Sequence, residues 1–147
     1  MNRMRKCLLV LAVASGLVSG AAYAKENSLY QRLGGYDAIA ALTDDFLGRL
    51  TSDDEFRKFF VGMSNDTKGR IRQHIVEFFC QATGGPCVYT GRDMKTVHTG
   101  LGITEDEWKK SVVYIGESMN ALKIAPAEQK DLGMALAPLE KDIVEKK

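Results

Sequence analysis

The architecture is set by one stretch, which carries both histidines of the chain: Arg72-Gln-His-Ile-Val-Glu-Phe-Phe79, Gly84-Gly-Pro86 and Tyr89-Thr-Gly-Arg-Asp-Met-Lys-Thr-Val-His98. In its first part, Ile71, Ile75, Phe78 and Ala82 advance by three or four positions, which predicts an amphipathic helix that carries His74. The Gly-Gly-Pro corner ends this helix, because glycine favours the left-handed turn and proline cannot continue the hydrogen-bond ladder. A second, shorter helix carries His98 four residues after Met94, on the same side.

The same helical spacing recurs on both sides of this stretch. Three further apolar stripes have it: Ile39, Leu42, Phe46 and Leu50; Trp108, Val112, Ile115, Met119 and Leu122; and Leu132, Leu136, Leu139 and Ile143. Thr104 and Glu107 form a capping box at the start of the second stripe, and Asn65 or Asp66 could cap the helix of His74. No alternating apolar run is long enough for a sheet, so the sequence predicts an all-α, single-domain protein.

The first residues have the pattern of a secretory signal peptide. A basic start at Arg3, Arg5 and Lys6 precedes a short apolar run, and Ala22-Tyr-Ala24 matches a cleavage site. We therefore expect residues 1–24 to be removed and residues 25–147 to form the domain, in the periplasm or secreted. The alternative is an uncleaved membrane anchor; after cleavage we expect no stable membrane insertion.

Cleavage would remove three basic and no acidic residues, so the net charge would fall from +1 to −2. No basic patch with interleaved aromatic residues is present, and we expect no nucleic-acid partner. The mature chain keeps Cys80 and Cys87, which an oxidising compartment would favour as a disulfide. The alternative is two unrelated free thiols.

Taken alone, the histidines leave the chemistry open. A histidine on an apolar helix face is more often a satisfied core residue than a ligand, although two such histidines favour one shared metal or cofactor. The sequence contains neither a zinc-ligand set nor a Cys-x-x-Cys-His haem-attachment signature.

Motifs spread over nearly the whole mature chain resemble the truncated haemoglobins of the first group. They are Leu29-Tyr-Gln-Arg-Leu-Gly-Gly35, Asp45-Phe46, Phe59-Phe60, Phe78-Phe79 with Gly84-Gly85, Tyr89-Thr-Gly-Arg92, Met94, His98 and Gly102-Ile-Thr104. The resemblance implies a two-over-two helical globin that holds haem b non-covalently. It also implies a monomer that binds oxygen, nitric oxide and carbon monoxide.

The resemblance assigns roles to residues on the proximal side. His98 matches the proximal iron ligand, and Phe60 matches an aromatic residue that packs on the haem face. Proximal haem contacts fall on Met94, Ile103, Trp108 and Val112, and the haem propionates would pair with Arg92 and Lys95, near Tyr89. Ordinary core packing and a solvated charged face are the alternatives for these two sets.

The distal side departs from the pattern of many relatives. Leu47, after Phe46, stands where a tyrosine commonly bonds oxygen, and Ile71 and Ile75 stand where glutamines are common. The remaining distal candidate is His74, which the resemblance makes a sixth iron ligand or a partner of a propionate or water. The last helix has no histidine, so we do not expect a covalent haem link.

The functional expectation is a reversible gas-binding protein. One alternative is a haem redox enzyme, a nitric oxide dioxygenase or a peroxidase-like catalyst, which would need an electron donor. The other is a bis-histidine protein for electron transfer or redox sensing.

Overall fold

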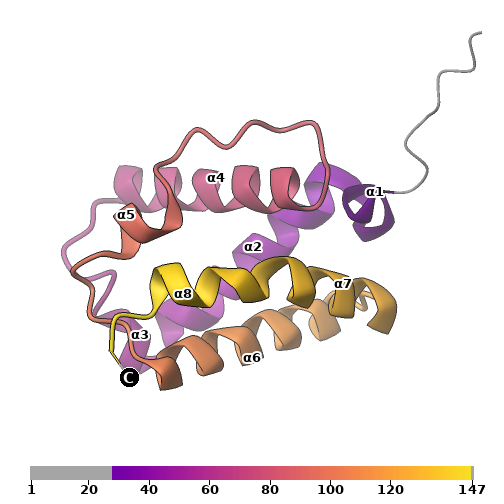
Figure 1. Ribbon diagram of the computed structural model, residues 1–147. Helices are drawn as coiled ribbons and strands as arrows, with labels where there is room; N and C mark the ends of the chain where they lie inside the picture. The colour runs from indigo at the N-terminus through magenta and orange to yellow at the C-terminus, as the bar shows by residue number, and fades with distance from the viewer. Residues whose placement is uncertain (1–27, 147) are drawn as a thin grey trace, which may run out of the picture.

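Three long helices frame the structure, a computed structural model that describes residues 28–146: α2 (Gly35–Ser52), α4 (Asn65–Ala82) and α6 (Glu105–Ala121). Helix α2 packs against both α4 and α6. In Figure 1, α2 passes behind, between α4 above and α6 below, and α7 (Pro126–Leu136) and α8 (Glu140–Ile143) lie over α6. The described residues contain helices and one isolated bridge, between Thr104 and Lys146, so the all-α prediction is confirmed.

Short helical segments connect the frame. They are α1 (Leu29–Leu33), α3 (Asp54–Arg57), α5 (Met94–His98) and the 3-10 turn η1 (Ala137–Leu139). The predicted signal peptide, residues 1–24, lies outside the described residues. Within those residues, no helix combines the length and the apolar character needed to span a membrane.

Side-chain caps set the boundaries of the long helices. The predicted capping box is confirmed: the Glu107 amide donates to Thr104 Oγ1 over 3.2 Å, and the Thr104 amide donates to Glu107 Oε2 over 2.8 Å. The predicted cap of α4 was one or two residues late. Ser64 is extended and its hydroxyl accepts from the Thr67 amide, so Asn65 and Asp66 already belong to the helix.

The core confirms one predicted stripe and corrects another. Ile39, Leu42, Phe46 and Leu50 of α2 are buried as expected. Helix α4 instead buries a neighbouring set, Val76, Phe79 and Cys80. Of the predicted stripe, Ile71, Ile75 and Phe78 are half-buried and Ala82 is exposed. Periodicity could not decide between these sets, because α4 has apolar residues on two adjacent sides.

The last predicted stripe is divided between α7, η1 and α8. Leu132 and Leu136 are buried on α7, and Pro138 lies in the 3-10 turn that follows. Proline has no amide hydrogen and cannot continue an α-helical ladder, so α7 ends at Leu136, Leu139 lies in the 3-10 turn and Ile143 lies in α8. The segment after α8 then returns to the start of α6, where the Thr104–Lys146 bridge forms.

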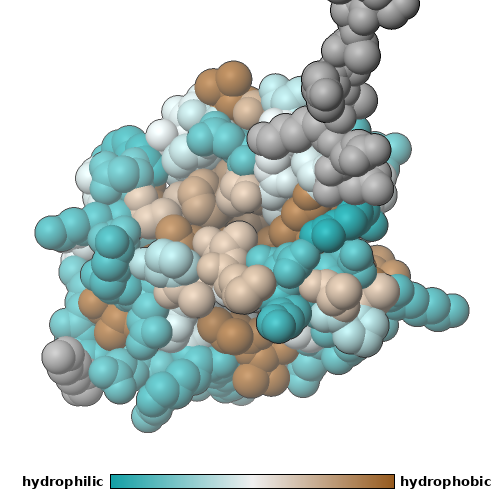
Figure 2. Space-filling view, turned by 45° about the vertical axis from the view of Figure 1, so that its right-hand side comes forward, coloured by the Kyte–Doolittle hydropathy of each residue, from teal (hydrophilic) through white to brown (hydrophobic). Residues whose placement is uncertain are grey.

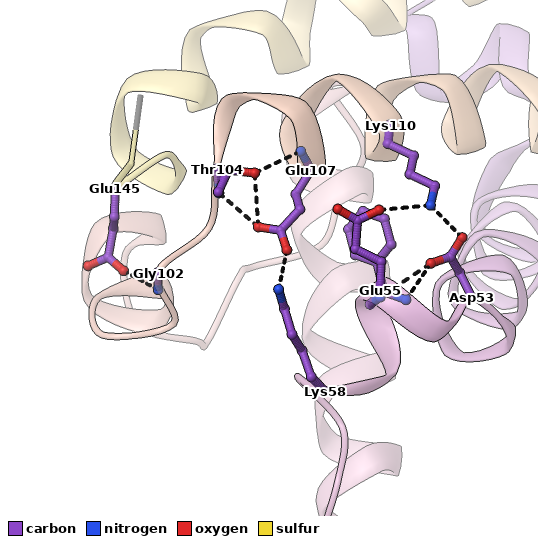
Figure 3. Close-up of polar contacts among 9 residues, drawn as sticks. Asp53, Glu55, Lys58, Gly102, Thr104, Glu107, Lys110 and Glu145 are labelled. Atoms are coloured by element: carbon purple, nitrogen blue, oxygen red, sulfur yellow. Dashed lines mark hydrogen bonds and ion pairs between the residues drawn. The ribbon is translucent and has the colours of Figure 1, made fainter.

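A polar network fastens the α2–α3 corner to α6 (Figure 3). Lys110 Nζ lies 2.7 Å from Asp53 Oδ2 and 2.9 Å from Glu55 Oε2, and the Tyr114 hydroxyl donates to Asp53 over 2.6 Å. The donors Lys110 and Tyr114 hold the pKa of Asp53 well below its usual 3.8. The carboxylate is therefore ionised wherever the network is intact.

Candidate functional site

Two long helices leave apolar faces only partly covered. On α4 the half-buried residues are Ile71, Ile75 and Phe78, and on α6 they are Trp108 and the 47% exposed Val112. Figure 2 shows apolar residues across the middle of one face of the molecule, with hydrophilic residues around them. A contiguous apolar area with a polar rim is typical of a ligand site.

His98 is the last residue of α5 and is half-buried. Its Nδ1 lies 2.7 Å from the carbonyl oxygen of Met94, one turn earlier, and can donate to it. In the tautomer in which Nδ1 donates, this bond orients the ring and leaves the lone pair of Nε2 free, which is the arrangement of a metal-binding histidine. No hydrogen bond within residues 28–146 uses the Nε2 of His98.

His74 lies on α4 with 41% of its side chain exposed. Its Nδ1 is nevertheless buried, and it has no hydrogen-bond partner among the described residues. The nearest carboxylate oxygen, Oε2 of Glu77, is 3.6 Å away, which is longer than a hydrogen bond. Since the buried Nδ1 faces Glu77, the accessible part of the ring lies on another side. Among the described residues, 28–146, no hydrogen bond or ring contact joins His74 to His98.

Tyr89 packs beside His74, because the chain after the Gly-Gly-Pro corner runs back along α4. Its ring centroid is 6.0 Å from that of His74 and 5.4 Å from that of Phe78, both edge to face. Its hydroxyl donates to the Arg92 carbonyl over 2.6 Å, and a Cβ at Gly91 would lie 2.3 Å from this hydroxyl. Burial raises the pKa of Tyr89, so the hydroxyl keeps its proton.

Glu77 anchors this returning segment to α4. Its carboxylate accepts from the Thr90 hydroxyl over 2.9 Å and from the Thr90 amide over 3.2 Å. The hydroxyl donation is the main reason that the pKa of Glu77 lies below its usual value. Glu77 therefore carries a negative charge close to Nδ1 of the His74 ring.

A cavity of about 140 Å³ lies between α2 and α4. The predicted distal residues Leu47 and Ile71 line it, together with Phe60, Gly48, Thr51 and Lys68. A water molecule has a share of about 30 Å³ in the liquid, so the space is ample for a diatomic molecule. Leu47, Ile71 and Phe60 are apolar, and the Thr51 hydroxyl donates to the Leu47 carbonyl, so the Lys68 ammonium is the remaining side-chain donor in the lining.

The segment that carries Phe60 is held by a buried carboxylate. Glu107 is 2% exposed and pairs with the Lys58 ammonium, two residues before Phe60 (Figure 3). Burial alone would raise the pKa of Glu107, but the bonds from Lys58 and Thr104 lower it below its usual value. The ion pair between exposed Lys58 and buried Glu107 thus fixes one wall of the cavity to the start of α6.

The other predicted site residues occupy several environments. Ile103 is buried, Met94, Ile75 and Trp108 are half-buried, and Phe46 lies in the core. The side chains of Arg92 and Lys95 are exposed and form no ion pair within residues 28–146. Those residues contain no cluster of three or more histidine, cysteine or acidic side chains that could hold a metal ion.

Cys80 and Cys87 are placed as a disulfide at the end of α4, with their Cα atoms 5.8 Å apart. Cys80 is fully buried among core residues that include Val76 and Phe79. The cysteines therefore lie at the corner that leads to Tyr89.

Sequence reasoning did not identify Glu77, Lys68 or Glu107 as parts of the site. Glu77 follows His74 by three residues, which places the two on neighbouring parts of a helix surface and could have indicated contact. The pairing of Lys58 with Glu107 spans 49 residues and has no local signal.

Comparisons with known proteins give one consistent result. A family model described as bacterial-like globin matches residues 28–145. The group 1 truncated hemoglobin GlbN of Mycolicibacterium paratuberculosis is 32% identical over 120 residues, which cover 82% of this chain and 86% of that protein. The GlbN of a Nostoc species is 28% identical over 104 residues, 71% of this chain and 86% of that protein.

Solved structures have the same arrangement of helices. The Fe(III) form of truncated hemoglobin from Tetrahymena pyriformis aligns with a TM-score of 0.74 at 21% identity, over 82% of this chain and all of that one. A 2/2 hemoglobin from Synechococcus with covalently attached heme aligns at 0.73 and 22%, over 80% and 98% of the two chains. The predicted two-over-two fold is confirmed.

Proposed function

The chain belongs to the bacterial-like globin family as a group 1 truncated haemoglobin, and we propose that it is an exported haem b protein that reversibly binds oxygen and other diatomic gases. Globins bind haem and, through it, gases such as oxygen. His98 as the proximal ligand, His74 as the resting sixth ligand and non-covalent haem are the specific parts of the proposal.

The observation that carries the proposal is the ring orientation of His98. Its Nδ1 is engaged by the Met94 carbonyl, so Nε2 is the atom available to a metal. Haem is a flat apolar ring with two carboxylates at one edge. The half-covered apolar faces of α4 and α6 suit the ring, and the exposed cations Arg92 and Lys95 suit the propionates. The residues present therefore fit haem, whose iron would supply the binding site for a gas.

His74 is proposed as the internal distal ligand. Its buried Nδ1 faces Glu77, and no hydrogen bond in the described residues uses its Nε2. The alternative remains a position at the haem edge, bonded to a propionate or to water. An internal ligand must leave before a gas binds. The apparent gas affinity would therefore be the intrinsic affinity multiplied by the fraction of time that the iron is open.

Leu47, Ile71 and Ile75 supply no hydrogen-bond donor on the distal side. Polar groups near a bound ligand decide between oxygen storage and oxygen activation. An apolar cavity lined by Leu47 and Ile71 therefore supports reversible binding over nitric oxide dioxygenation, which needs a stable oxygen complex and an electron donor.

The positions of the histidines support the proposal of non-covalent haem. The chain has histidines only at positions 74 and 98, and α7 and α8 carry none. The Synechococcus protein with covalently attached heme is similar in fold, and the covalent link is not part of the proposal for this chain.

Export is proposed from residues 1–24 and is supported by the paired placement of Cys80 and Cys87, since disulfides persist in oxidising compartments. Mass spectrometry of the protein from periplasm or medium should give a chain that begins at Lys25. A full-length chain in the membrane fraction would contradict cleavage.

A bis-histidine electron-transfer protein is the second candidate, because both histidines keep Nε2 free of hydrogen bonds in the described residues. The two candidates differ in their behaviour after reduction. A gas-binding protein forms a stable ferrous carbonyl and a reversible oxygen complex, whereas an electron-transfer protein remains bis-histidine ligated and is rapidly oxidised by oxygen.

Absorption spectra of the ferric, ferrous and ferrous-carbonyl forms test the proposal. We expect low-spin six-coordinate spectra without gas, high-spin or water-bound ferric iron in His74→Leu with faster carbon monoxide binding, and loss of stoichiometric haem or an altered spectrum in His98→Ala. Unchanged haem content and an unchanged carbonyl spectrum in His98→Ala would refute proximal ligation. A five-coordinate wild-type spectrum would refute only the ligation of iron by His74 and would leave the role of His98 intact.

A further inference from the structure

The backbone that carries His98 has little support of its own. Helix α5 comprises only five residues, and a helix this short is not stable without tertiary contacts. The loop after it has left-handed glycines at Gly100 and Gly102, with φ of 89° and 67°. The position of His98 therefore depends on tertiary contacts, including those that hold this loop.

Glu145, beyond the end of α8, holds it from across the fold. Its carboxylate accepts from the Gly100 amide over 2.8 Å and from the Gly102 amide over 2.5 Å, and Figure 3 shows the second bond. One oxygen serves each amide, so a single side chain fixes two points of the loop. These points lie two and four residues after His98.

Main-chain bonds place this carboxylate. The amides of Glu145 and Lys146 donate to the Ile103 carbonyl over 2.8 and 3.1 Å, and the Glu105 amide donates to the Lys146 carbonyl over 3.1 Å. The segment after α8 is thus bonded to both ends of the Gly102–Glu105 turn.

The carboxylate is suited to this role by its charge. The Gly100 amide, followed by the Gly102 amide, lowers the pKa of Glu145 below its usual value. Hydrogen bonds to an ionised acceptor are about twice as strong as neutral ones. An ionised Glu145 therefore restrains the loop more firmly than a neutral side chain of the same shape.

We propose that Glu145 is a positioning residue for the proximal histidine: by binding the Gly100 and Gly102 amides it sets the place and tilt of His98 relative to the haem plane. Glu145 contacts neither haem nor iron in this role, which rests on the proposed function of His98 as the iron ligand.

The test compares Glu145→Ala and Glu145→Gln with Glu140→Gln, a control that removes the same charge from exposed α8. In apoprotein, hydrogen exchange of the Gly100 and Gly102 amides should be about tenfold faster or more in Glu145→Ala, as expected for loss of a charge-assisted bond. Glu145→Gln should be intermediate, because it retains one acceptor oxygen. The control should match wild type.

The second readout is the iron–histidine vibration of the ferrous protein in the His74→Leu background, where His98 is the only protein ligand. We expect its frequency to shift in Glu145→Ala and haem transfer to a scavenger globin to accelerate about tenfold. A purely structural role of Glu145 would change stability but leave the frequency unchanged. If Glu145→Ala does not fold, Glu145→Gln decides by the same two readouts.

The outcomes separate the two proposals. Wild-type protein that binds no haem would overturn the proposed function. Wild-type protein that binds haem through His98, with Glu145 variants identical to it in amide exchange and in vibration, would overturn only the role of Glu145.

Discussion

His74 Nδ1 lies 3.6 Å from Glu77 Oε2, buried and without a hydrogen-bond partner among the described residues. A small rotation of the imidazole would let Nδ1–H donate to this carboxylate. Carboxylates behind metal-binding histidines fix the tautomer and raise the basicity of the ligand nitrogen. In the proposed function, where His74 is the distal ligand, Glu77 is thus placed to favour binding of iron by His74.

We predict that Glu77→Gln weakens distal ligation, because a neutral amide raises the basicity of His74 less than a carboxylate does. The high-spin fraction of the ferric spectrum should rise, and carbon monoxide should bind faster. Thr90→Val is the control, since it removes a donor to the same oxygen but leaves the charge. An equal effect of both variants would show that the returning segment matters and the charge does not.

Leu47→Tyr should slow oxygen dissociation, because Leu47 lines the distal cavity with Ile71 and Phe60. A neutral hydrogen bond contributes roughly 0.5–1.5 kcal/mol net, so we expect an effect of about two- to tenfold in stopped-flow measurements. Leu47→Phe supplies the ring without the hydroxyl. If the two variants release oxygen equally fast, the side chain does not reach the bound ligand.

Protein from the oxidising compartment should contain no free thiol. A bridge between residues seven apart reduces the conformational entropy of the unfolded chain, which stabilises the folded protein by roughly 2–3 kcal/mol in the chain-entropy model. Cys87→Ser, or gentle reduction, should therefore lower the melting temperature by about 10 °C with haem retained. Two titratable thiols in fully exported protein would refute the bridge. Cys87 is the better position for the variant, because Cys80 is fully buried.

Acid should weaken the anchor between the α2–α3 corner and α6. The pKa of Asp53 is lower in the folded protein than its usual 3.8, so its contribution to stability is complete above that value and is lost as pH falls through the folded pKa. Asp53→Asn keeps a good helix cap but loses the charge.

We expect Asp53→Asn to melt about 3 °C below wild type at neutral pH, and this gap to close in strong acid. Asp54→Asn, at an exposed neighbour, should change little at any pH. A gap for Asp53→Asn that is independent of pH would mean that its cause is packing and not charge.

Much of the fold could be predicted from local pattern. The helix of His74, the corner at Gly84 and the capping box of Thr104 all follow from residues within one or two turns of each other. Local pattern could not decide which side of α4 is buried, because Val76 and Ile75 are both apolar neighbours. That choice depends on packing against α2, which is a property of the whole fold.

The site divides in the same way. The Nδ1 bond of His98 to Met94 joins residues four apart, and their spacing indicated that they share a side of the helix. The clamp of Glu145 on Gly100 and the pair of Lys58 with Glu107 join residues distant in the sequence. No periodicity or motif reports such contacts, so they became visible only when the chain was folded.

The separation of 45 residues between Gly100 and Glu145 also orders events during biosynthesis. A ribosome adds about 5–20 residues per second, so His98 is made about 2–9 s before Glu145, the residue proposed to steady its loop, and the apolar face of α4 is made earlier still. A cofactor captured in that interval would be held by a loosely placed histidine and could escape. Secure loading should therefore wait until Glu145 has been made and has bound the loop, and for an exported chain it would follow translocation.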